Sequence, residues 1–323
     1  MVYKNRKKRG YCACGKRTSI TENCVYVCKD CGNMVKRLTD KLGGEEGISK
    51  NDAQLLKIIK KGNLSPKELQ TLVRGSKNTK RTNPYKHYAN SDHYKMGVFS
   101  DAHIGQENFD EKLFAYMGDK FREEEVEAVY QVGDILEGMS GRDGQIYELK
   151  EVGFSAQINK AEQLFKDHLY DLDVYGITGN HDLWFQNKGN MGINVGEELD
   201  NRVENYTHLG DMEADVKLAP NVSMKLFHPG DGSAYAISYK LQKLMESFTG
   251  GEKPNIVLEG HYHKALYFFN RNIHGVECGT ICGQTGWMRG KKLPAHKGFW
   301  VIDVGLNKKG VTSFAPTFYP SYD

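Results

Sequence analysis

The sequence predicts an α/β protein in which layered sheets carry a polar site at the ends of their strands. From residue 94 onward, short apolar runs typical of buried strands alternate with longer segments typical of helices. Four of five polar fragments directly follow an apolar run, and the fifth ends one. Open α/β sheets place their active sites where the strands end, so the fragments are expected to converge there.

The elements of this domain follow from the same alternation. We expect helices at 108–124 and 153–171. Strands are expected at 94–100, 127–132, 173–178, 222–228, 255–259, 265–269 and 298–304. Helical segments lie between several of these strands, which is the pattern of an α/β architecture with layered sheets.

The residues that precede this domain have a different charge. Residues 1–90 contain 21 Lys and Arg against 7 Asp and Glu, a balance of +14, whereas residues 91–323 contain 23 against 34, a balance of −11. An asymmetry of this size indicates two domains, with nucleic acid as the expected partner of the basic one. The alternative is a solvated basic tail.

The basic part itself divides into three regions. We expect a basic arm and zinc ribbon at 1–40, a short helical segment at 41–82 and a linker at 83–93, followed by the large domain at 94–323. In the helical segment, Ser65-Pro66-Lys67-Glu68 supplies a capping serine, a proline at the first helical position and a glutamate at the third. An earlier helix is expected after Asn51 and Asp52, and the two short helices together resemble a helix-turn-helix fragment, although such pairs often simply pack together.

Five of the seven cysteines fall within one stretch near the N-terminus. The pairs Cys12/Cys14 and Cys28/Cys31 are each followed by glycine, which lets the backbone turn its N–H groups toward thiolate sulfurs. Two such turns make a tetrahedral site, so we expect one structural zinc bound by these four residues. Cys24 is a spare thiol that could replace one of them, and a redox or chance cluster is the alternative.

Membrane association is not expected. No apolar run approaches the roughly 18 residues that a bilayer-spanning helix needs. The basic N-terminus is not followed by the apolar segment of a secretory signal. We therefore expect a cytoplasmic protein.

The five polar fragments contain the residue types of a two-metal hydrolytic site. They are Asp101-Ala102-His103, Gly133-Asp134, Gly179-Asn180-His181-Asp182, His228 and Gly260-His261-Tyr262-His263. Such a site needs two divalent cations about 3.5–4 Å apart and a carboxylate that bridges them. Asp134 suits the bridge because its glycine turn lets the backbone come close. Alternate residues of a strand-end segment point the same way, so Asp101 with His103, and His261 with His263, should each face a common centre.

This ordered set of motifs resembles the calcineurin-like metallophosphoesterase superfamily over residues 94 to about 305. The resemblance implies a four-layer αββα sandwich, with 94–323 as the catalytic domain. By motif, Asp101, His103 and His263 would hold the first cation, Asn180, His228 and His261 the second, and Asp134 both. A hydroxide between the cations would attack phosphorus, His181 would orient the phosphate and protonate the leaving oxygen, and Asp182 would orient His181.

The residues around the bridging aspartate separate branches of this superfamily. The Ser/Thr protein phosphatases carry G-D-x-V-D-R-G, which is replaced here by Gly133-Asp134-Ile135-Leu136-Glu137-Gly138, so dephosphorylation of proteins is not expected. The start Asp101-Ala102-His103-Ile104-Gly105 and the G-N-H-D motif resemble the SbcD-type DNA repair nucleases, which are manganese-dependent. Glu137 departs from them, because the position is often histidine there, and its role is left open.

Together these features predict a metal-dependent phosphodiesterase that acts on nucleic acid, DNA rather than RNA. Manganese is the first choice of metal, and iron, nickel, cobalt or zinc are alternatives. The basic module would hold the phosphate backbone of a polymeric substrate. The other functions considered are a phosphodiesterase of small cyclic nucleotides or nucleotide esters, and a non-catalytic nucleic-acid-binding scaffold. SbcD-type nucleases dimerise, so a homodimer is left open.

Overall fold

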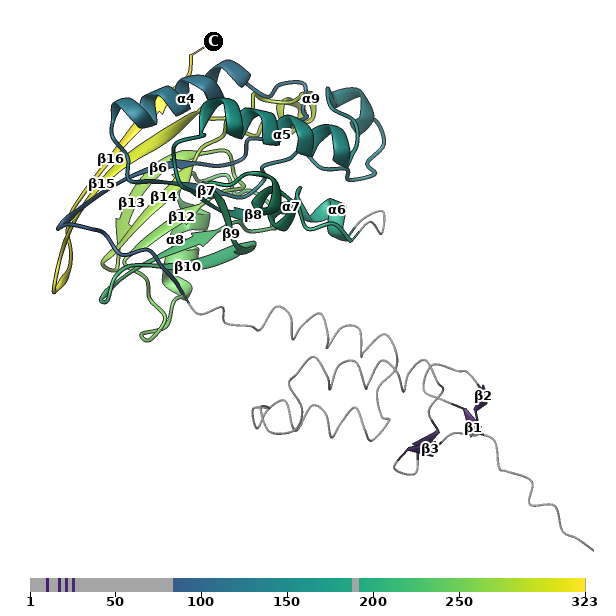
Figure 1. Cartoon of the computed structure of the whole chain (residues 1–323), viewed down its shortest axis with the longest axis horizontal. Coiled ribbons are helices and arrows are strands. Elements are labelled where there is room, and N and C mark those ends of the chain that lie inside the picture. Colours follow the sequence, from purple (N-terminus) through teal and green to yellow (C-terminus); the bar gives the residue numbers. More distant parts are fainter. Residues whose placement is uncertain are drawn as a thin grey trace, which may run out of the picture. The chain divides into compact units, whose positions relative to one another are not determined.

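In the computed structural model of this 323-residue chain, the described residues are 84–187 and 192–322, with four two-residue strands nearer the N-terminus (Figure 1). These strands are β1 (Gly10–Tyr11), paired with β2 (Arg17–Thr18), and β3 (Thr21–Glu22), paired with β4 (Val25–Tyr26). The chain divides into two units, Met1–Arg81 and Thr82–Asp323. The predicted zinc ligands Cys12, Cys14, Cys28 and Cys31, the spare Cys24 and the helical segment at 41–82 lie outside the described residues.

Two six-stranded sheets form the centre of the second unit. The first has the order β16-β15-β6-β7-β8-β9, with β6 (His93–Phe99), β7 (Ala128–Val132), β8 (Val174–Thr178), β9 (Tyr206–Asp211), β15 (Gly298–Asn307) and β16 (Gly310–Pro320). The second has the order β13-β14-β12-β11-β10-β5, with β5 (Tyr85–Lys86), β10 (Glu213–Ala219), β11 (Val222–Phe227), β12 (Ile256–Glu259), β13 (Ala265–Asn270) and β14 (Ile273–Cys278).

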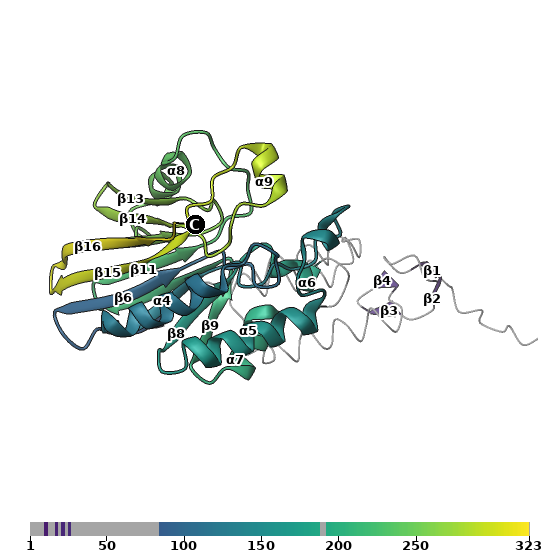
Figure 2. The ribbon, with the colours of Figure 1, turned by 90° about the horizontal axis from the view of Figure 1, so that it is seen from above.

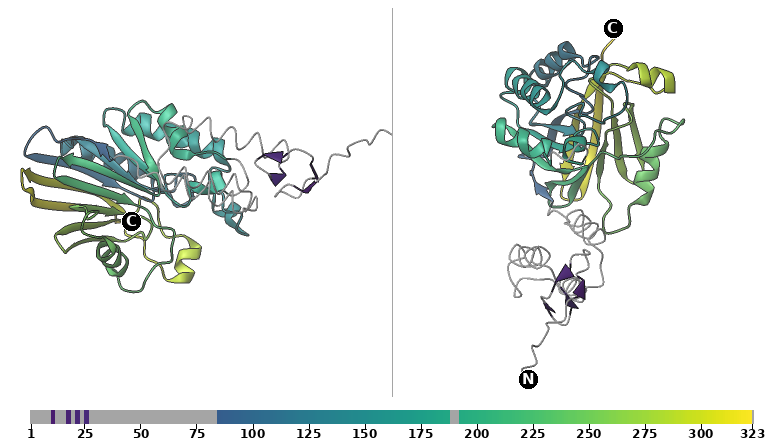
Figure 3. Two further views of the ribbon diagram at one scale, coloured as in Figure 1. Left: turned by 90° about the horizontal axis from the view of Figure 1, so that it is seen from below. Right: turned by 90° about the vertical axis from the view of Figure 1, so that its right-hand side faces the viewer.

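Helices cover the outer faces of both sheets, which gives four layers (Figures 2 and 3). The helices are α4 (Glu111–Glu123), α5 (Phe154–His168), α6 (Leu183–Asn187), α7 (Val195–Arg202), α8 (Tyr239–Ser247) and α9 (Gly286–Lys291), with a 3-10 helix η2 (Gln145–Glu148). Helices α4, α5 and α7 pack on the first sheet, and α8 packs on the second. The predicted αββα sandwich is confirmed.

The apolar residues of each central strand alternate between the two sides of its sheet. In β6, Met96 and Val98 are buried between the two sheets, whereas Phe99 packs toward the helices. In β12, Leu258 is buried between the sheets and Val257 packs against α8. Because both faces of each sheet are covered, these strands appear in the sequence as nearly continuous apolar runs.

Parallel pairing brings the ends of the central strands to one edge of each sheet. β6, β7 and β8 are parallel neighbours in the first sheet, and β11 and β12 are parallel neighbours in the second. The segments that follow these strands are 100–104, 133–137, 179–182, 228 and 260–263, which contain the predicted site residues. The fold therefore delivers all five fragments from strand ends, as the sequence predicts.

Several strands are additional to the prediction. β16 is an edge strand whose residues are mostly exposed or half-buried, so it lacks the apolar signal of a central strand. β5 lies within 83–93, the expected linker, and pairs with Val216 and Lys217 of β10. His87 N extends this pairing by donating to Lys217 O. Part of that segment is therefore a sheet edge rather than a linker, because its backbone groups find partners on β10.

Within the described ranges, no helix combines the length and the apolar character that crossing a bilayer requires.

Candidate active site

The loops that follow β6 and β7 run side by side and bring the first two motifs together. Asp101 N donates to Gly133 O over 3.0 Å, and His103 N donates to Asp134 O over 3.1 Å. An isolated parallel bridge continues this pairing just beyond His103. Backbone hydrogen bonds therefore align the D-x-H motif with the G-D motif independently of the side chains.

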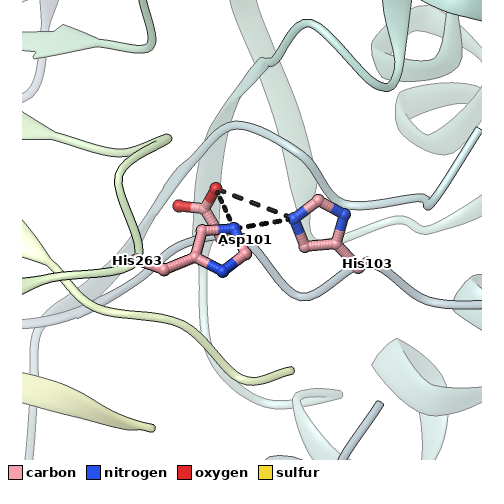
Figure 4. A group of neighbouring side chains, drawn as sticks. All are labelled: Asp101, His103 and His263. Atoms are coloured by element: carbon pink, nitrogen blue, oxygen red, sulfur yellow. Dashed lines mark hydrogen bonds and ion pairs between the residues drawn. The ribbon is translucent and has the colours of Figure 1, made fainter. Parts of the chain in front are cut away.

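Asp101, His103 and His263 form a first group of candidate ligands (Figure 4). Nε2 of His263 lies 3.2 Å from Asp101 Oδ1, and Nε2 of His103 lies 3.8 Å from the same oxygen. The two imidazole Nε2 atoms are 3.1 Å apart. One ligand atom from each residue lies within 4.8 Å of the others, so a single cation can contact all three.

Asp134, His228 and His261 form a second group. Nε2 of His228 lies 3.2 Å from Asp134 Oδ2, while its Nδ1 donates to Val132 O over 2.7 Å. Nε2 of His261 donates to Asp231 O over 2.6 Å. Because a carbonyl oxygen can only accept, the ring nitrogen left for a cation is Nε2 in His228 and Nδ1 in His261.

The carboxylate of Asp134 faces both groups. Its Oδ2 lies 3.2 Å from His228 Nε2 in the second group and 3.9 Å from His103 Nε2 in the first. Its Oδ1 accepts a 2.8 Å hydrogen bond from His181 N, which fixes the carboxylate plane. This is the placement that a bridging ligand between two cations requires.

The unshared electron pairs of these side chains fit divalent cations. His228 Nε2 lies 3.2 Å from the Asp134 carboxylate, and a contact this close needs positive charge between the two groups, supplied either by a proton on the ring or by a divalent cation that displaces it. Asn180 Oδ1 and His228 Nε2 are also buried without a hydrogen-bond partner among the described residues. Imidazole, carboxylate and amide donors together suit manganese, iron, nickel, cobalt or zinc.

The same contacts shift the pKa values of the site. Burial opposes the charged form of His228, but the carboxylates of Asp134 and Asp101 outweigh it and raise its pKa to about 9. For His261, burial and the nearby His228 lower the pKa to about 4. Burial alone would raise the pKa of the Asp134 carboxyl, yet His228 and His181 hold it below its usual range. The bridging carboxylate is therefore ionised at neutral pH, as cation binding requires.

Five candidate ligands have a left-handed backbone conformation. The φ angle is 52° at Asp101, 50° at His103, 51° at Asp134, 81° at His261 and 55° at His263. Non-glycine residues rarely adopt this region, at a cost on the order of 1–3 kcal/mol each. The sequence interpretation assumed extended segments with alternate residues on one side. That geometry is corrected: each ligand sits at a kink in a loop, and the kinks bring the side chains to common centres.

Two glycines that precede candidate ligands make room for the side chains of the site. A Cβ atom on Gly133, whose φ is +85°, would lie 2.1 Å from His228 Nδ1. A Cβ atom on Gly179 would lie 2.1 Å from Asp134 Oδ1. Glycine at these positions therefore serves close approach of the ligands in addition to turning the chain.

Glu137 connects a candidate ligand with the candidate acid. Its Oε2 accepts from His103 Nδ1 over 2.9 Å and lies 3.5 Å from His181 Nδ1. Its carbonyl oxygen accepts from His181 Nδ1 over 2.8 Å, and its Oε1 accepts from Gln145 Nε2 over 3.2 Å. Nδ1 is therefore the donor in each ring. This leaves Nε2 of His103 to face the first group of candidate ligands, and Nε2 of His181 to contact a bound molecule.

The predicted role of Asp182 is corrected by its contacts. Its buried carboxylate accepts from the backbone N atoms of Gly179, Ile135 and Leu136, over 2.8, 3.2 and 2.9 Å. Among the described residues no hydrogen bond joins it to the His181 ring, which Glu137 orients instead. Asp182 ties the G-D loop to the G-N-H-D loop, and burial together with the charge of Asp134 raises its pKa to about 7.

The structure thus brings together the predicted Asp101, His103, Asp134, His228, His261 and His263, and places Asn180 and His181 in the adjoining loop. The sequence did not reveal the residues that hold these side chains in place. Trp184 packs on the His181 ring with 3.9 Å between ring centroids, and Asp231 holds His261. The departure at Glu137 was visible in the sequence, but its two histidine partners lie 34 and 44 residues away along the chain.

Residues 94–296, more than half of the chain, match the family model of the calcineurin-like phosphoesterase superfamily domain. No curated protein matches the chain significantly. Among solved structures, an archaeal phosphodiesterase is 16% identical with a TM-score of 0.42, and covers 70% of this chain and 99% of its own. The phosphoesterase Yfce from E. coli is 13% identical with a TM-score of 0.38, over 68% of this chain and 98% of its own. Vps29 from Entamoeba histolytica is 13% identical with a TM-score of 0.35, over 70% and 99%.

Gly133→Ala tests the packing around His228. We expect it to abolish manganese binding, because the added methyl group would lie 2.1 Å from His228 Nδ1. Gly141→Ala is the matched control: Gly141 also has a positive φ of +71°, but its added Cβ would meet nothing within 4 Å. Isothermal titration with manganese measures both. Equal affinities in the two variants would contradict the packing argument.

Exchanging Glu137 and Gln145 tests the hydrogen bonds behind His103. Glu137→Gln keeps the shape but turns an amide N–H toward either Gln145 Nε2 or His103 Nδ1, which are themselves donors. We expect it to weaken manganese binding by about 10- to 100-fold, as removal of a partner behind a metal ligand does.

The double variant E137Q/Q145E should recover most of that affinity. A carboxylate at position 145 can accept from Ser140 N and Oγ, as Gln145 does at 2.7 and 2.8 Å, and also from the new amide at position 137. Each hydrogen bond among positions 137, 145 and 140 then again has one donor and one acceptor, with the carboxylate and the amide exchanged. A double variant no better than the single one would show that Glu137 acts on His103 in another way.

Proposed function

Because the chain belongs to the calcineurin-like phosphoesterase superfamily, we propose that it is a nuclease that hydrolyses phosphodiester bonds of nucleic acid, with DNA rather than RNA as the substrate. The catalytic part of the proposal rests on one observation, the two ligand groups that share the Asp134 carboxylate. The family is one of metal-dependent phosphoester hydrolases. That accounts for the chemistry and leaves the substrate to the other residues of this chain.

The residues of the site divide into cation ligands and a proton donor. Asp101, His103 and His263 would hold the first cation, Asn180, His228 and His261 the second, and Asp134 both, with manganese as the first choice. When bound, the cations supply a water activated for attack and neutralise charge on the phosphate. A phosphate held between the two groups would lie near His181, because the backbone N of His181 donates to Asp134 Oδ1 over 2.8 Å.

His181 is placed to act on the leaving oxygen. Its Nδ1 is held by Glu137 O, so Nε2 is the nitrogen that can donate to substrate. Its side chain keeps 22% of its surface exposed, whereas that of Asp101 is fully buried. Trp184 and His103 pack against the ring, with centroids 3.9 and 4.5 Å away, and restrict its rotation. A proton donor held in this way contributes about 10²–10⁴-fold to the rate.

Charge favours a polymeric substrate over a small one. The balance of +14 in residues 1–90 precedes a balance of −11 in residues 91–323, so the basic part can hold a phosphate backbone while the acidic domain holds cations. A mononucleotide ester would fit the ligand groups equally well but would not need the basic part. The resemblance to SbcD-type nucleases points the same way.

The proposal also includes a zinc site in the N-terminal region, a cellular location and a partner. One structural zinc would be bound by Cys12, Cys14, Cys28 and Cys31 and would stabilise a module too small to fold on its apolar residues alone. We propose a cytoplasmic enzyme with nucleic acid as its partner. A homodimer is compatible with this function.

Two substitutions test the catalytic roles. Asp134→Ala should abolish manganese-dependent hydrolysis of both bis-p-nitrophenyl phosphate and DNA. The effect of His181→Ala should depend on the leaving group of the substrate. p-Nitrophenolate departs without a proton, so hydrolysis of bis-p-nitrophenyl phosphate should slow little. Cleavage of DNA should fall about 10²–10⁴-fold, because its leaving oxygen needs a proton. The measurement is kcat/KM at saturating manganese, with His274→Ala as the control, because His274 lies at the start of β14, at the opposite end of the strand from the site. A wild type inactive with every divalent metal would favour the scaffold alternative.

The basic arm tests the substrate class. Replacing Lys4, Arg6, Lys7, Lys8 and Arg9 by serine in the full-length chain should weaken DNA binding and flatten its salt dependence, by about 0.9 in slope for each phosphate that the arm no longer neutralises. Hydrolysis of bis-p-nitrophenyl phosphate should not change. Serine at the exposed Lys308 and Lys309 is the control. If DNA cleavage survives all these changes and cyclic mononucleotides are preferred, the substrate is a small ester.

A further inference from the structure

Exposed aromatic and cationic side chains lie on two segments that flank the site, η2 with its preceding loop and α9. We propose that Tyr147, Trp287 and Arg142, together with the cations of α9, form a binding surface for the bases and backbone of single-stranded nucleic acid. This inference rests on the proposed function and adds the strand state of the substrate to it. We call these residues the base platform.

The first half of the base platform is attached directly to the site. Gln145, the first residue of η2, is buried and donates to Glu137 Oε1 over 3.2 Å, and Glu137 contacts both His103 and His181. The end of η2 is held from the other side, where Glu107 N donates to Glu148 O over 2.9 Å. Tyr147 lies between these two anchors and keeps 86% of its surface exposed. It is thus a solvent-facing aromatic ring on a held segment next to the candidate acid.

The second half is attached to the first candidate ligand. Asp101 O accepts from Thr280 Oγ1 over 2.8 Å and from Ile281 N over 3.3 Å, and the chain then leads into α9. Thr285 caps this helix by accepting from Met288 N, and Met288 is buried beneath it. Trp287 therefore faces outward and is 48% exposed. Figure 2 shows α9 beside the ends of the strands of the second sheet.

Arg142 joins the two halves. Its guanidinium lies 5.8 Å from the centroid of the Trp287 ring and forms an ion pair with Glu148 of η2. A guanidinium over the face of an indole places positive charge beside the aromatic surface on which a nucleobase can stack. Segments far apart in sequence, one holding Arg142 and the other Trp287, therefore share one aromatic and cationic surface.

The charge of α9 and the residues after it fits a polyanion. Residues 286–297 contain Arg289, Lys291, Lys292 and Lys297 and no Asp or Glu. Arg289, Lys291 and Lys292 are exposed, and none of them forms an ion pair within the described part of the chain. Cations without acidic partners are the groups that release counterions when they meet phosphates. The rest of this domain is acidic, but these three cations directly follow Trp287 in the chain.

The aromatic rings decide between single strands and duplex. In a duplex the faces of the bases are covered by their stacked neighbours, so exposed Tyr and Trp rings can contact only the backbone or the groove edges. In a single strand each base can place a face on an aromatic side chain, which is worth about 1–3 kcal/mol per base. The base platform therefore favours single strands, whereas a surface of cations alone would not discriminate.

Equilibrium binding of fluorescein-labelled oligonucleotides tests the proposal in the full-length chain. Fluorescence anisotropy is measured in the Asp134→Ala background so that the oligonucleotide stays intact. Tyr147→Ala and Trp287→Ala should each weaken binding of a thymidine 15-mer by about 5- to 150-fold, and should leave binding of a duplex of equal length unchanged within about twofold. An abasic 15-mer with the same charge cannot stack on either ring, so it should bind the parent protein at least as weakly as the thymidine 15-mer binds each single variant.

Tyr170→Ala is the matched control. Tyr170 is 63% exposed and lies over a guanidinium, with Arg122 Cζ 4.9 Å from its ring centroid, but it precedes β8 and so lies at the opposite ends of the strands from the site. This variant should bind both oligonucleotides as the parent does. Unchanged single-strand binding in the Tyr147 and Trp287 variants would overturn the proposal and leave the surface to a protein partner. An equal weakening for single strand and duplex would also overturn it.

Activity separates this proposal from the proposed function. With Asp134 intact, Tyr147→Ala and Trp287→Ala should hydrolyse bis-p-nitrophenyl phosphate as the wild type does, because neither side chain belongs to the ligand groups. Their kcat/KM on the thymidine 15-mer should fall in proportion to the weakening of binding. If the wild type cleaves nothing, the proposed function fails while the binding measurements still decide the base platform. If the parent binds no oligonucleotide, both fail.

Discussion

The site depends on electron-rich groups that converge in a buried place. Asp101 and Asp134 are buried carboxylates, and imidazole nitrogens of His263 and His228 each lie 3.2 Å from one of them. Burial of such groups is unfavourable unless positive charge compensates it. Divalent cations bound by the two ligand groups would meet that need, and the same charge would neutralise a bound phosphate. Stability of the site and catalysis therefore share one electrostatic cause, and removal of a ligand should affect both.

The surrounding structure holds this convergence through backbone groups rather than through long side chains. Asp101 accepts from His261 N, Asp134 accepts from His181 N, and Asp182 accepts from three backbone N atoms of two loops. Each carboxylate thus binds a neighbouring motif as well as facing the centre. These hydrogen bonds offset part of the cost of the positive φ angles at five candidate ligands. Backbone hydrogen bonds of this kind hold the candidate ligands in one arrangement before any ligand binds, which is the preorganisation that catalytic sites need.

Much of the fold was predictable because central strands are covered on both faces. Residues 128–132 and 174–178 are entirely buried, so their apolar runs were visible, and the polar fragments stood out at their ends. Edge elements were less visible: β16 exposes much of its length, and β5 has only two residues that pair with β10. The ligand types were recognisable for the same reason as the strands, since histidine and aspartate directly after a buried run have few structural uses. Their partners were not, because Glu137 meets His103 and His181 only across loops.

The sequence by itself determined the layered α/β class, the chemistry of the candidate ligands and the charge contrast between the two parts of the chain. These depend on residue type and spacing, which are local properties. The tertiary structure alone decided which carboxylate serves which histidine, that Asp182 ties loops together while Glu137 orients His181, and that Tyr147 and Trp287 flank one site. These depend on distances between residues far apart in the chain. Such distances are set by sheet order and loop hydrogen bonds, for which no single segment of sequence holds the information.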